Sequence, residues 1–249
     1  MPVPDRRILG VKFAVLNRSQ AIELVGGALD SGKQLKVAFA NANTLNLAFN
    51  DAAYRLALDN FLILNDGIGV DLASWMKFGC AFPDNLNGTD FVPSFLSAVC
   101  KPLRIYLIGS SAEAARQACA GLAKRWPRHL IVGWRSGFFH CQHEIDEACR
   151  VIQAANPDVL LVGMGNPQQE LWIAHNAETT GAKLALGVGA LVDFLAGRVT
   201  RAPRIIRNAR CEWIFRLALE PRRLARRYSI GNLLFLLRVF RESYNVRLQ

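Results

Sequence analysis

Carboxylate and amide side chains follow four apolar runs of this sequence, and they are the groups with which the chain could do chemistry. They stand within a few residues of the ends of these runs: Asn41, Asn43 and Thr44 after residues 35–40, Asp66 after residues 61–64, Gln169 and Glu170 after residues 158–165, and Asp193 after residues 185–189. A carboxylate near an acceptor hydroxyl can act as a general base, and amides can bind a base edge or sugar hydroxyls. The residue types therefore favour proton transfer on a polar substrate.

Other common catalytic arrangements are missing from the sequence. No serine or cysteine nucleophile can be matched to a histidine with an orienting acid, and there is no Walker A motif. The four histidines form no HxxxH or HxH pair, so we expect neither a metal nor another cofactor. The six cysteines lack CxxC spacing and are predicted to be buried free thiols in a reducing compartment.

The elements that must position the polar side chains alternate between apolar runs and helical segments. We predict strands at residues 11–16, 35–40, 61–64, 103–108, 130–134, 158–165 and 185–189, and helices at 20–30, 44–60, 90–100, 112–126, 144–155 and from 167 onward. Unbroken apolar runs bounded by glycines are typical of parallel strands buried on both faces, and Pro167 suits the first turn of a helix. The sequence therefore predicts an α/β fold with a Rossmann-like, mostly parallel sheet and helices on both faces. Ligands of such sheets bind beyond the carboxyl ends of the strands.

Two regions of different composition are apparent. Residues 1–200 are predicted to form the α/β body, as one unit or as two lobes divided near residue 100, and residues 201–249 a helical basic appendage. Within the body, the turn from Gly109 to Ser111 opens a helix whose N-terminus could bind phosphate. It lacks the full GxGxxG motif, so the dinucleotide signal of an oxidoreductase is weak.

The positive charge of the chain lies at its C-terminal end. From Arg198 onward there are thirteen arginines and three glutamates, which accounts for the whole net charge of +10. This excess indicates an acidic partner: nucleic acid, a phosphorylated small molecule or an anionic membrane surface. A stripe at helical spacing lies beside Arg238 and Arg241: Leu233, Leu234, Leu236, Leu237 and Phe240. It could pack on its own domain, on a second copy in a homo-oligomer, or on a membrane surface.

Signals for secretion or membrane insertion are absent from the sequence. Residues 1–7 lack the long apolar core of a signal peptide, and no window reaches the roughly 18 apolar residues of a spanning helix. We therefore expect a cytoplasmic protein.

Several ordered motifs across nearly the whole chain resemble one known family. They are Asn65-Asp66-Gly67, Asn87-Gly88-Thr89-Asp90, Gly165-Asn-Pro167-Gln-Gln169-Glu170, Gly187-Val-Gly189-Ala-x-x-Asp193, Arg201-Ala-Pro203 and the segment 212–228. On these motifs the chain is similar to the WecG/TagA/CpsF glycosyltransferases. The resemblance implies an inverting, metal-independent transfer of a hexose from a UDP-sugar to a polyprenyl-diphosphate-linked sugar. It also implies peripheral binding at the inner face of the cell membrane, in exopolysaccharide or cell-envelope polysaccharide synthesis.

Carried over by position, the resemblance implies that Asp66 is the catalytic base. The nucleotide-sugar contacts fall on Asn43, Gln169 and Asp193, and the diphosphate contacts on Arg222, Arg223, Arg226 and Arg227. Residues of the same motifs complete the expected substrate-binding set: Asn41, Thr44, Asn87 and Glu170.

Two departures from the family pattern bear on the substrate. Asn85 begins the segment to Asp90, where many members have Arg-x-x-Gly-Thr-Asp, and Asn41-Ala-Asn43 stands where many have Thr-x-Asn. The second departure resembles the branch that adds glucose in xanthan-type assembly. UDP-glucose is therefore the favoured donor, and UDP-N-acetylmannosamine the alternative.

Each expected site residue also has a structural interpretation. In that interpretation Asp66 and Asp193 serve only to cap the helix or turn that follows. Gln169 and Glu170 are then ordinary first-turn residues favoured by the helix dipole. A competing function is a nucleic-acid-binding module that uses the basic tail. Such a module predicts basic residues interleaved with exposed aromatics across a groove, whereas the charge here is confined to one end, so we expect no nucleic-acid partner.

Overall fold

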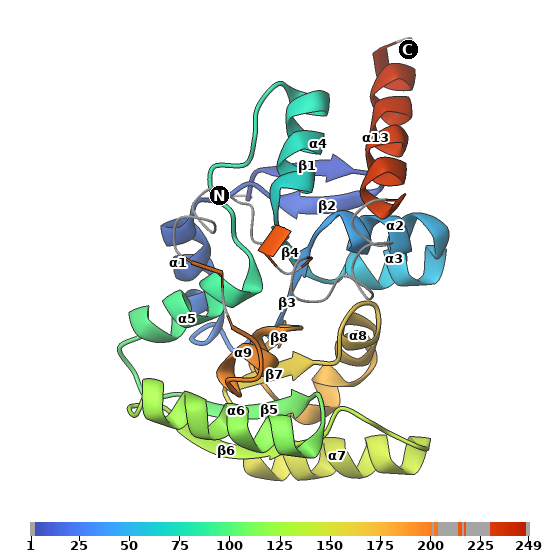
Figure 1. The fold of residues 1–249 in the computed structure, drawn as a ribbon. Helices are drawn as coiled ribbons and strands as arrows, with labels where there is room; N and C mark the ends of the chain where they lie inside the picture. Colours follow the sequence, from blue (N-terminus) through green and yellow to red (C-terminus); the bar gives the residue numbers. More distant parts are fainter. Residues whose placement is uncertain (1–2, 201, 204–213, 216, 218–229, 248–249) are drawn as a thin grey trace.

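The protein is built on one eight-stranded sheet (Figure 1). The computed structural model describes residues 3–200, 202–203, 214–215, 217 and 230–247. In their order across the sheet, the strands are β1 (Asp5–Ile8), β2 (Val11–Ala14), β4 (Leu62–Asn65), β3 (Leu35–Ala40), β8 (Leu184–Gly187), β7 (Val159–Gly163), β5 (Arg104–Gly109) and β6 (Leu130–Arg135). The β1–β2 hairpin is antiparallel and the other pairs are parallel, which confirms the predicted fold class.

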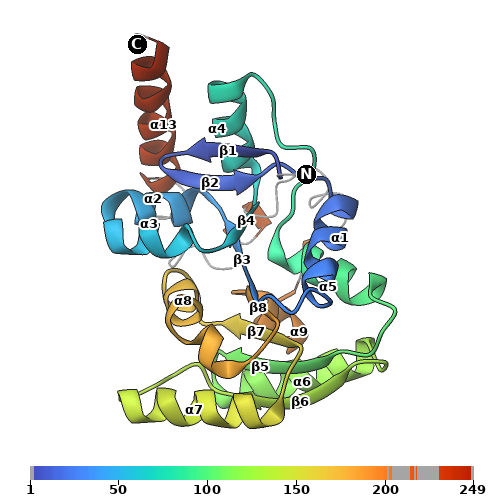
Figure 2. The ribbon, with the colours of Figure 1, turned by 180° about the vertical axis from the view of Figure 1, so that it is seen from behind.

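Helices cover both faces of this sheet (Figure 2). One face carries α1 (Arg18–Ala28), α5 (Gly88–Ala98), α6 (Ala112–Arg125) and α9 (Leu191–Leu195). The other face carries α2 (Ala42–Asn50), α3 (Ala52–Leu58), α4 (Ile68–Phe78), α7 (Gln142–Ala155), α8 (Gln168–Thr180) and α13 (Asn232–Arg247). Successive side chains of a strand point to opposite faces of the sheet. In β3, Val37 and Phe39 therefore pack into the core on the α1 face, and Ala38 and Ala40 into the core on the α2 face.

The helices that follow the strands begin in two ways. Asn41 starts α2 by accepting hydrogen bonds from the backbone N–H groups of Asn43 and Thr44. Such a cap satisfies donors that the first turn of a helix leaves unpaired. Before α4 stands Gly67, with φ of 88° and no side-chain cap, in a conformation that favours glycine. No side chain caps the start of α4, so Asp66 does not have the capping role that the sequence left open for it.

The structure corrects three sequence predictions. The helix expected over residues 44–60 is broken at Asp51, which has an extended backbone and caps α3 by accepting from the N–H of Tyr54. Pro167 precedes the first residue of α8 instead of lying in its first turn. The described cysteines are free, and two of them, Cys119 and Cys149, are buried. The other three lie in connections between elements and are exposed, contrary to the prediction: Cys80, Cys100 and Cys141.

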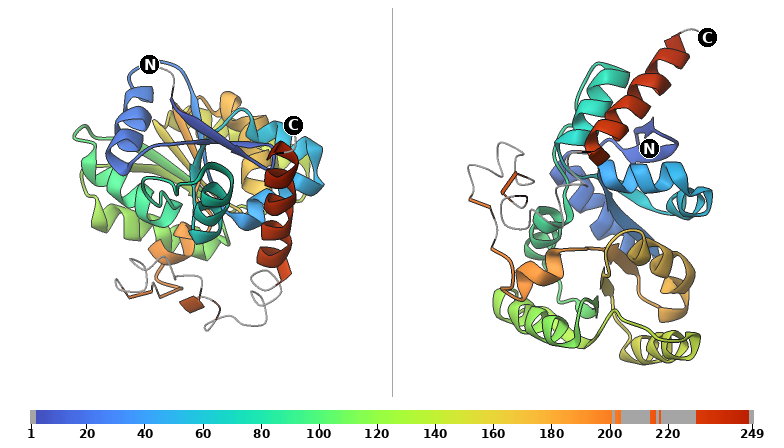
Figure 3. Two further views of the ribbon diagram at one scale, coloured as in Figure 1. Left: turned by 90° about the horizontal axis from the view of Figure 1, so that it is seen from above. Right: turned by 45° about the vertical axis from the view of Figure 1, so that its right-hand side comes forward.

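The C-terminal helix α13 packs against α4 and α2, at the end of the molecule that holds the β1–β2 hairpin (Figure 3). Its fully buried side chains are Phe235 and Val239. Most of the leucine stripe predicted from the sequence faces outward instead, since Leu233, Leu234, Leu237 and Phe240 are between 45 and 61 % exposed. The helix therefore packs on its own domain through one face and leaves another apolar face uncovered.

The predicted division of the chain into domains stays a prediction. Strands from both sides of residue 100 pair directly, because β3 lies beside β8. The boundary expected near residue 200 stays a prediction, since residues 204–213 are outside the described ranges. None of the described helices has the length and apolar character that crossing a bilayer requires.

Candidate active site

The polar residues singled out in the sequence gather at one edge of the sheet. The strand register pairs Ala40 with Asn65 and Val162 with Gly187, so β3, β4, β7 and β8 all end at that edge. After β3 the chain continues into α2 on one face, and after β8 into α9 on the other. Open α/β sheets bind their ligands where neighbouring strands diverge in this way. We therefore take this carboxyl edge as the candidate active site.

Asn41 and Asp66, from neighbouring strand ends, form a hydrogen-bonded pair. The Nδ2 of Asn41 donates to Oδ2 of Asp66 at 3.0 Å. The Oδ1 of the same amide accepts from the first backbone N–H groups of α2, which fixes the direction in which the NH₂ group points. Both residues are partly exposed. The pair thus holds a carboxylate in a defined orientation at an accessible position, as a general base requires.

The loop before α5 closes against the end of β4. Asn85 Oδ1 accepts from the N–H of Gly67 at 2.9 Å, and Asn65 Nδ2 donates to the carbonyl of Asp84 at 2.8 Å. Asn87 is nearly buried and caps α5. Asn85 therefore supports the residue next to the Asn41–Asp66 pair, whereas the side chain of Asn87 stabilises its own loop.

Gln169, at the start of α8, joins the turns that follow two strands. Its Oε1 accepts from the backbone N–H groups of Gly165 at 3.2 Å and Gly189 at 3.0 Å, and its Nε2 donates to Oε1 of Glu170 at 2.7 Å. A Cβ atom at Gly187 would lie 3.1 Å from that nitrogen, so the glycine leaves room for the amide. Because Gln169 is only 3 % exposed, it shapes the two turns from within.

Glu170 is fully buried beneath the same turns. Its Oε2 accepts from the hydroxyl of Tyr54 at 3.0 Å, and its Oε1 accepts from Nδ2 of Asn166 at 2.7 Å as well as from Gln169. Burial raises the pKa of Glu170 to about 7, although these donors act in the opposite direction. Burial and the neighbouring carboxylate also raise the pKa of Tyr54. In this arrangement Glu170 reaches the edge only through Gln169 and Asn166.

Asp193 lies on α9 and faces the end of β5. Its Oδ1 accepts from the hydroxyl of Ser110 at 3.4 Å. The strand ends meet closely here, since a Cβ atom at Gly109 would lie 2.4 Å from the carbonyl oxygen of Gly163, and one at Gly163 would lie 2.3 Å from Cγ2 of Val192. Only glycine at both positions allows this approach.

Comparison with known proteins identifies the family of this chain. The Glycosyl transferase WecG/TagA/CpsF family matches residues 6–249. The chain belongs to this family. A curated relative, the N-acetylglucosaminyldiphosphoundecaprenol N-acetyl-beta-D-mannosaminyltransferase of Staphylococcus aureus (strain MRSA252), is 30 % identical over 227 residues, 90 % of this chain and 88 % of the relative. The protein of the same name from strain NCTC 8325 / PS 47 is 29 % identical over the same share of each chain. The family and the enzyme class expected from the sequence are thus confirmed: the protein is a glycosyltransferase.

Some expected substrate contacts of this glycosyltransferase are buried or lie outside the described ranges. Thr44 is buried, and its Oγ1 accepts from the N–H of Asn41 at 3.3 Å, so it supports the cap of α2. Asn43 is partly exposed in the first turn of that helix. The four arginines expected at the diphosphate lie outside the described residues: Arg222, Arg223, Arg226 and Arg227. In the part of the chain that is described, no three His, Cys, Asp or Glu side chains come together as metal ligands would.

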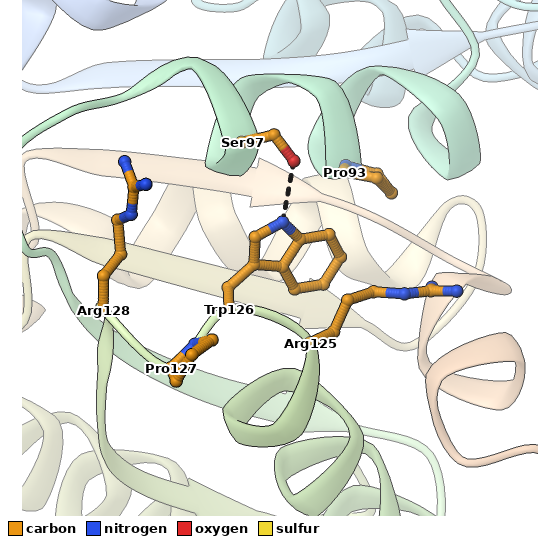
Figure 4. Close-up of a pocket in the computed structure, with 6 residues that line it drawn as sticks. All are labelled: Pro93, Ser97, Arg125, Trp126, Pro127 and Arg128. Carbon is orange, nitrogen blue, oxygen red and sulfur yellow. Dashed lines mark hydrogen bonds between the residues drawn. The ribbon is translucent and has the colours of Figure 1, made fainter.

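A hollow of about 650 Å³ lies at the opposite edge of the glycosyltransferase, where β5 and β6 begin (Figure 4). It is lined by Pro93, Ser97, Arg125, Trp126, Pro127 and Arg128. The indole of Trp126 donates to Ser97 at 2.8 Å, and the guanidinium of Arg125 lies over the indole ring. Because this hollow is remote from the carboxyl ends of the strands, we assign it no part in sugar transfer.

Two contributors to the edge of the glycosyltransferase were not found from the sequence. Tyr54 is separated from Glu170 by 116 residues, and no motif connects them. Asn85 was noted only as a departure from the family, without its contact to Gly67. The available signal for Asn85 was that a polar residue stands where the family pattern was expected to have arginine.

Proposed function

We propose that the enzyme transfers a hexose from a UDP-sugar to a sugar hydroxyl of a polyprenyl-diphosphate-linked acceptor, with inversion and without a divalent metal. The observation that carries this proposal is the Asn41–Asp66 pair at the carboxyl edge of a sheet in a chain of this family. The names of the Staphylococcus relatives, which specify a diphosphoundecaprenol-linked acceptor, support the acceptor class. The product would enter an exopolysaccharide or a cell-envelope polysaccharide.

In this proposal Asp66 is the general base of a single displacement. Its carboxylate takes the proton of the acceptor hydroxyl as that oxygen bonds to the anomeric carbon, and UDP leaves from the opposite face with the bonding electrons. A single displacement inverts the anomeric centre. Guanidinium groups suit the charge of the leaving UDP because each can donate two hydrogen bonds to phosphate oxygens. The arginines assigned to this role are Arg222, Arg223, Arg226 and Arg227.

Two observations point to different donor sugars. The relatives are named for N-acetylmannosaminyl transfer, whereas Asn41-Ala-Asn43 in this chain resembles the branch that adds glucose. Both donors place the same UDP group at the leaving position, so the mechanism is common to them. UDP-N-acetylmannosamine and UDP-glucose are therefore the first two donors to compare.

The decisive experiment offers the purified enzyme a panel of UDP-sugars together with a short-chain polyprenyl-diphosphate-sugar acceptor. We expect one donor to add a single hexose to the acceptor, detected by mass, with an inverted linkage by NMR. Transfer should continue in excess EDTA. If no donor is used and UDP does not bind, the proposal is wrong; if EDTA abolishes transfer and Mg²⁺ restores it, the metal-independent form is wrong.

We further propose that the enzyme binds an anionic membrane surface on the cytoplasmic side through α4 and α13. These neighbouring helices carry exposed apolar side chains, including Ile68, Leu72 and Trp75 at helical spacing on α4, and Leu237 on α13. Ile68 stands two residues after Asp66, so a bilayer that contacts this face would present the acceptor diphosphate near the proposed base. Arginines of the appendage would add attraction to anionic headgroups.

Vesicle binding tests this docking surface. The double substitution Trp75→Ser and Leu237→Ser, at residues 62 and 49 % exposed, should weaken binding to anionic vesicles by about tenfold, since buried apolar area drives insertion. The control is Leu130→Ser with Val151→Ser, at residues 55 and 51 % exposed on β6 and α7, which should bind as the wild type does. Equal binding by both double variants contradicts the proposal. A wild-type dimer that only the α4–α13 variant dissociates would assign this surface to a homo-oligomer instead.

A further inference from the structure

Glu170 is a buried acidic side chain that the proposed reaction does not use, and it lies at the centre of a hydrogen-bond network. Its carboxylate accepts from three different segments: Tyr54 of α3, Asn166 of the turn after β7, and Gln169 of α8. Glu170 and Tyr54 are both 0 % exposed. Burying a carboxylate is costly unless donors satisfy its oxygens, and here donors are placed on both of them.

The network determines which way the Gln169 amide faces. Glu170 offers only an acceptor to Gln169, and the N–H groups of Gly165 and Gly189 offer only donors. In the observed orientation, Nε2 meets the carboxylate and Oε1 meets the two N–H groups. If the amide turned by 180°, its oxygen would face the carboxylate and its NH₂ group would face two donors. The buried carboxylate and the two N–H groups therefore favour the same one of the two orientations.

This orientation shapes the turns after β7 and β8. Gly165 and Gly189 both have positive φ, of 79° and 49°, and both donate to the single Oε1 atom of Gln169. These turns lie at the carboxyl edge, where the donor nucleotide is expected to bind. We propose that Glu170 is a positioning residue that holds the Gln169 amide in place and so keeps both glycine turns in the shape that receives the donor. The proposal rests on the proposed function, because the donor is assigned to this edge.

Substitutions at Glu170 separate orientation from charge and from stability. Glu170→Gln keeps an oxygen for Asn166 and Gln169 and turns its NH₂ group toward the oxygen of Tyr54, whereas Glu170→Ala removes every acceptor. We expect Glu170→Ala to raise the KM for the UDP-sugar by about tenfold and to change kcat by less than about threefold. Glu170→Gln should return the KM to within about threefold of the wild-type value.

A control on the same helix identifies a purely structural role. Thr180 is also fully buried, at the far end of α8, where its hydroxyl donates to the carbonyl of Ala177 at 2.6 Å. Thr180→Val should lower the melting temperature without changing the KM. If Glu170→Ala behaves in the same way, or if Glu170→Gln loses as much donor affinity as Glu170→Ala, the positioning role is wrong.

A second measurement keeps this inference separate from the proposed function. Hydrogen exchange of the Gly165 and Gly189 amides, followed by NMR without any substrate, should be faster in Glu170→Ala than in the wild type and unchanged in Glu170→Gln. Exchange at the wild-type rate in Glu170→Ala contradicts the inference even if transfer is observed. If exchange is faster in Glu170→Ala but the wild-type enzyme uses no UDP-sugar, the inference about the network stands and only the proposed function is wrong.

Discussion

Two carboxylates at the same edge of the sheet lie in opposite environments. Asp66, after β4, is partly exposed and accepts a hydrogen bond from Asn41. Glu170, the third residue of α8, is 0 % exposed and accepts hydrogen bonds from the buried side chains of Tyr54 and Gln169 and from the partly exposed Asn166. In the sequence both look alike, as an acidic residue that stands near glycines shortly after an apolar run.

The difference teaches that position at a strand end does not by itself assign a role. A carboxylate that must exchange a proton with a substrate needs access, whereas one that is closed off by donors can only hold its neighbours in place. We therefore assign the chemistry of the proposed reaction to the β3–β4 side of the edge and the shape of the site to the β7–β8 side. Four predictions test this division, beginning with the largest expected effect.

Asp66→Asn should lower kcat by about 10² to 10⁴, because the amide cannot take the proton of the acceptor hydroxyl. Its oxygen can still accept from Asn41, so UDP affinity and melting temperature should stay near the wild-type values. Steady-state kinetics with isothermal titration of UDP measures both. A variant that retains most of its turnover would reduce Asp66 to a structural residue and remove the distinction between the two carboxylates.

Glu170 should make the stability of the protein depend on pH. Its folded pKa of about 7 lies above the ordinary value of 4.5, so the folded state binds the proton more tightly. The free energy of unfolding is then highest below pH 4.5, falls as the pH rises toward 7 and is level above that. The expected decrease is at most about 3 kcal/mol, from 1.36 kcal/mol for each pKa unit.

Urea unfolding between pH 4.5 and 8 measures this effect. Glu170→Gln has no such titration, so its stability relative to the wild type should increase across that range. Thr180→Val is the control, because Thr180 is buried on the same helix and has no titratable group, so the difference from wild type should not vary with pH. Parallel pH profiles for wild type and Glu170→Gln would show that burial does not affect the proton of Glu170.

Asn41 combines the two roles in one side chain, since it caps α2 and holds Asp66. Asn41→Ala should cost about 1 kcal/mol of stability through the lost cap, and about tenfold in kcat through the lost hydrogen bond to a charged group. Asn41→Ser, which can still cap, should recover the stability but not the turnover. Asn17→Ala removes a comparable cap from α1 and should affect stability alone. Recovery of both properties in Asn41→Ser would mean that the contact with Asp66 does not matter.

Ser110→Ala should have the smallest effect. The contact between Ser110 and Asp193 is 3.4 Å long, at the limit of a hydrogen bond, so its loss should change the KM for the donor by less than about threefold. Donor titrations with both proteins check this value. A tenfold change would mean that Ser110 contacts the donor itself and that the β5 end belongs to the binding surface.

The sequence was sufficient to predict the buried strands and the edge of the sheet at which their carboxyl ends meet. Apolar runs such as residues 35–40 and 159–163 carry an unambiguous signal because their side chains are buried on both faces of the sheet. The edge strand β1 was not found because its centre, Arg6 and Arg7, is polar. The bounds of α4 were not predicted, because Gly67 at its start provides no polar cap.

The candidate site was predictable as a set of residues but not as a set of environments. Motifs indicated Asp66, Gln169 and Glu170 together, yet burial depends on what packs over each side chain. Glu170 is enclosed partly by Tyr54, which comes from a helix 116 residues earlier in the chain. A contact of that separation is created by the tertiary fold and leaves no local pattern.

The glycines at the ends of β5 and β7 limit how this enzyme could acquire a new donor preference. A side chain at Gly109 would meet backbone and one at Gly163 would meet the core, so a library that randomises the whole edge should return glycine at both positions. Variation must then come from positions with room, such as Asn41, Asn43 and Asn85. Asn41 and Asn85 are also the two residues at which the sequence motifs were expected to differ from the family pattern. The β3–β4 side of the edge is thus the part on which selection for a different sugar can act.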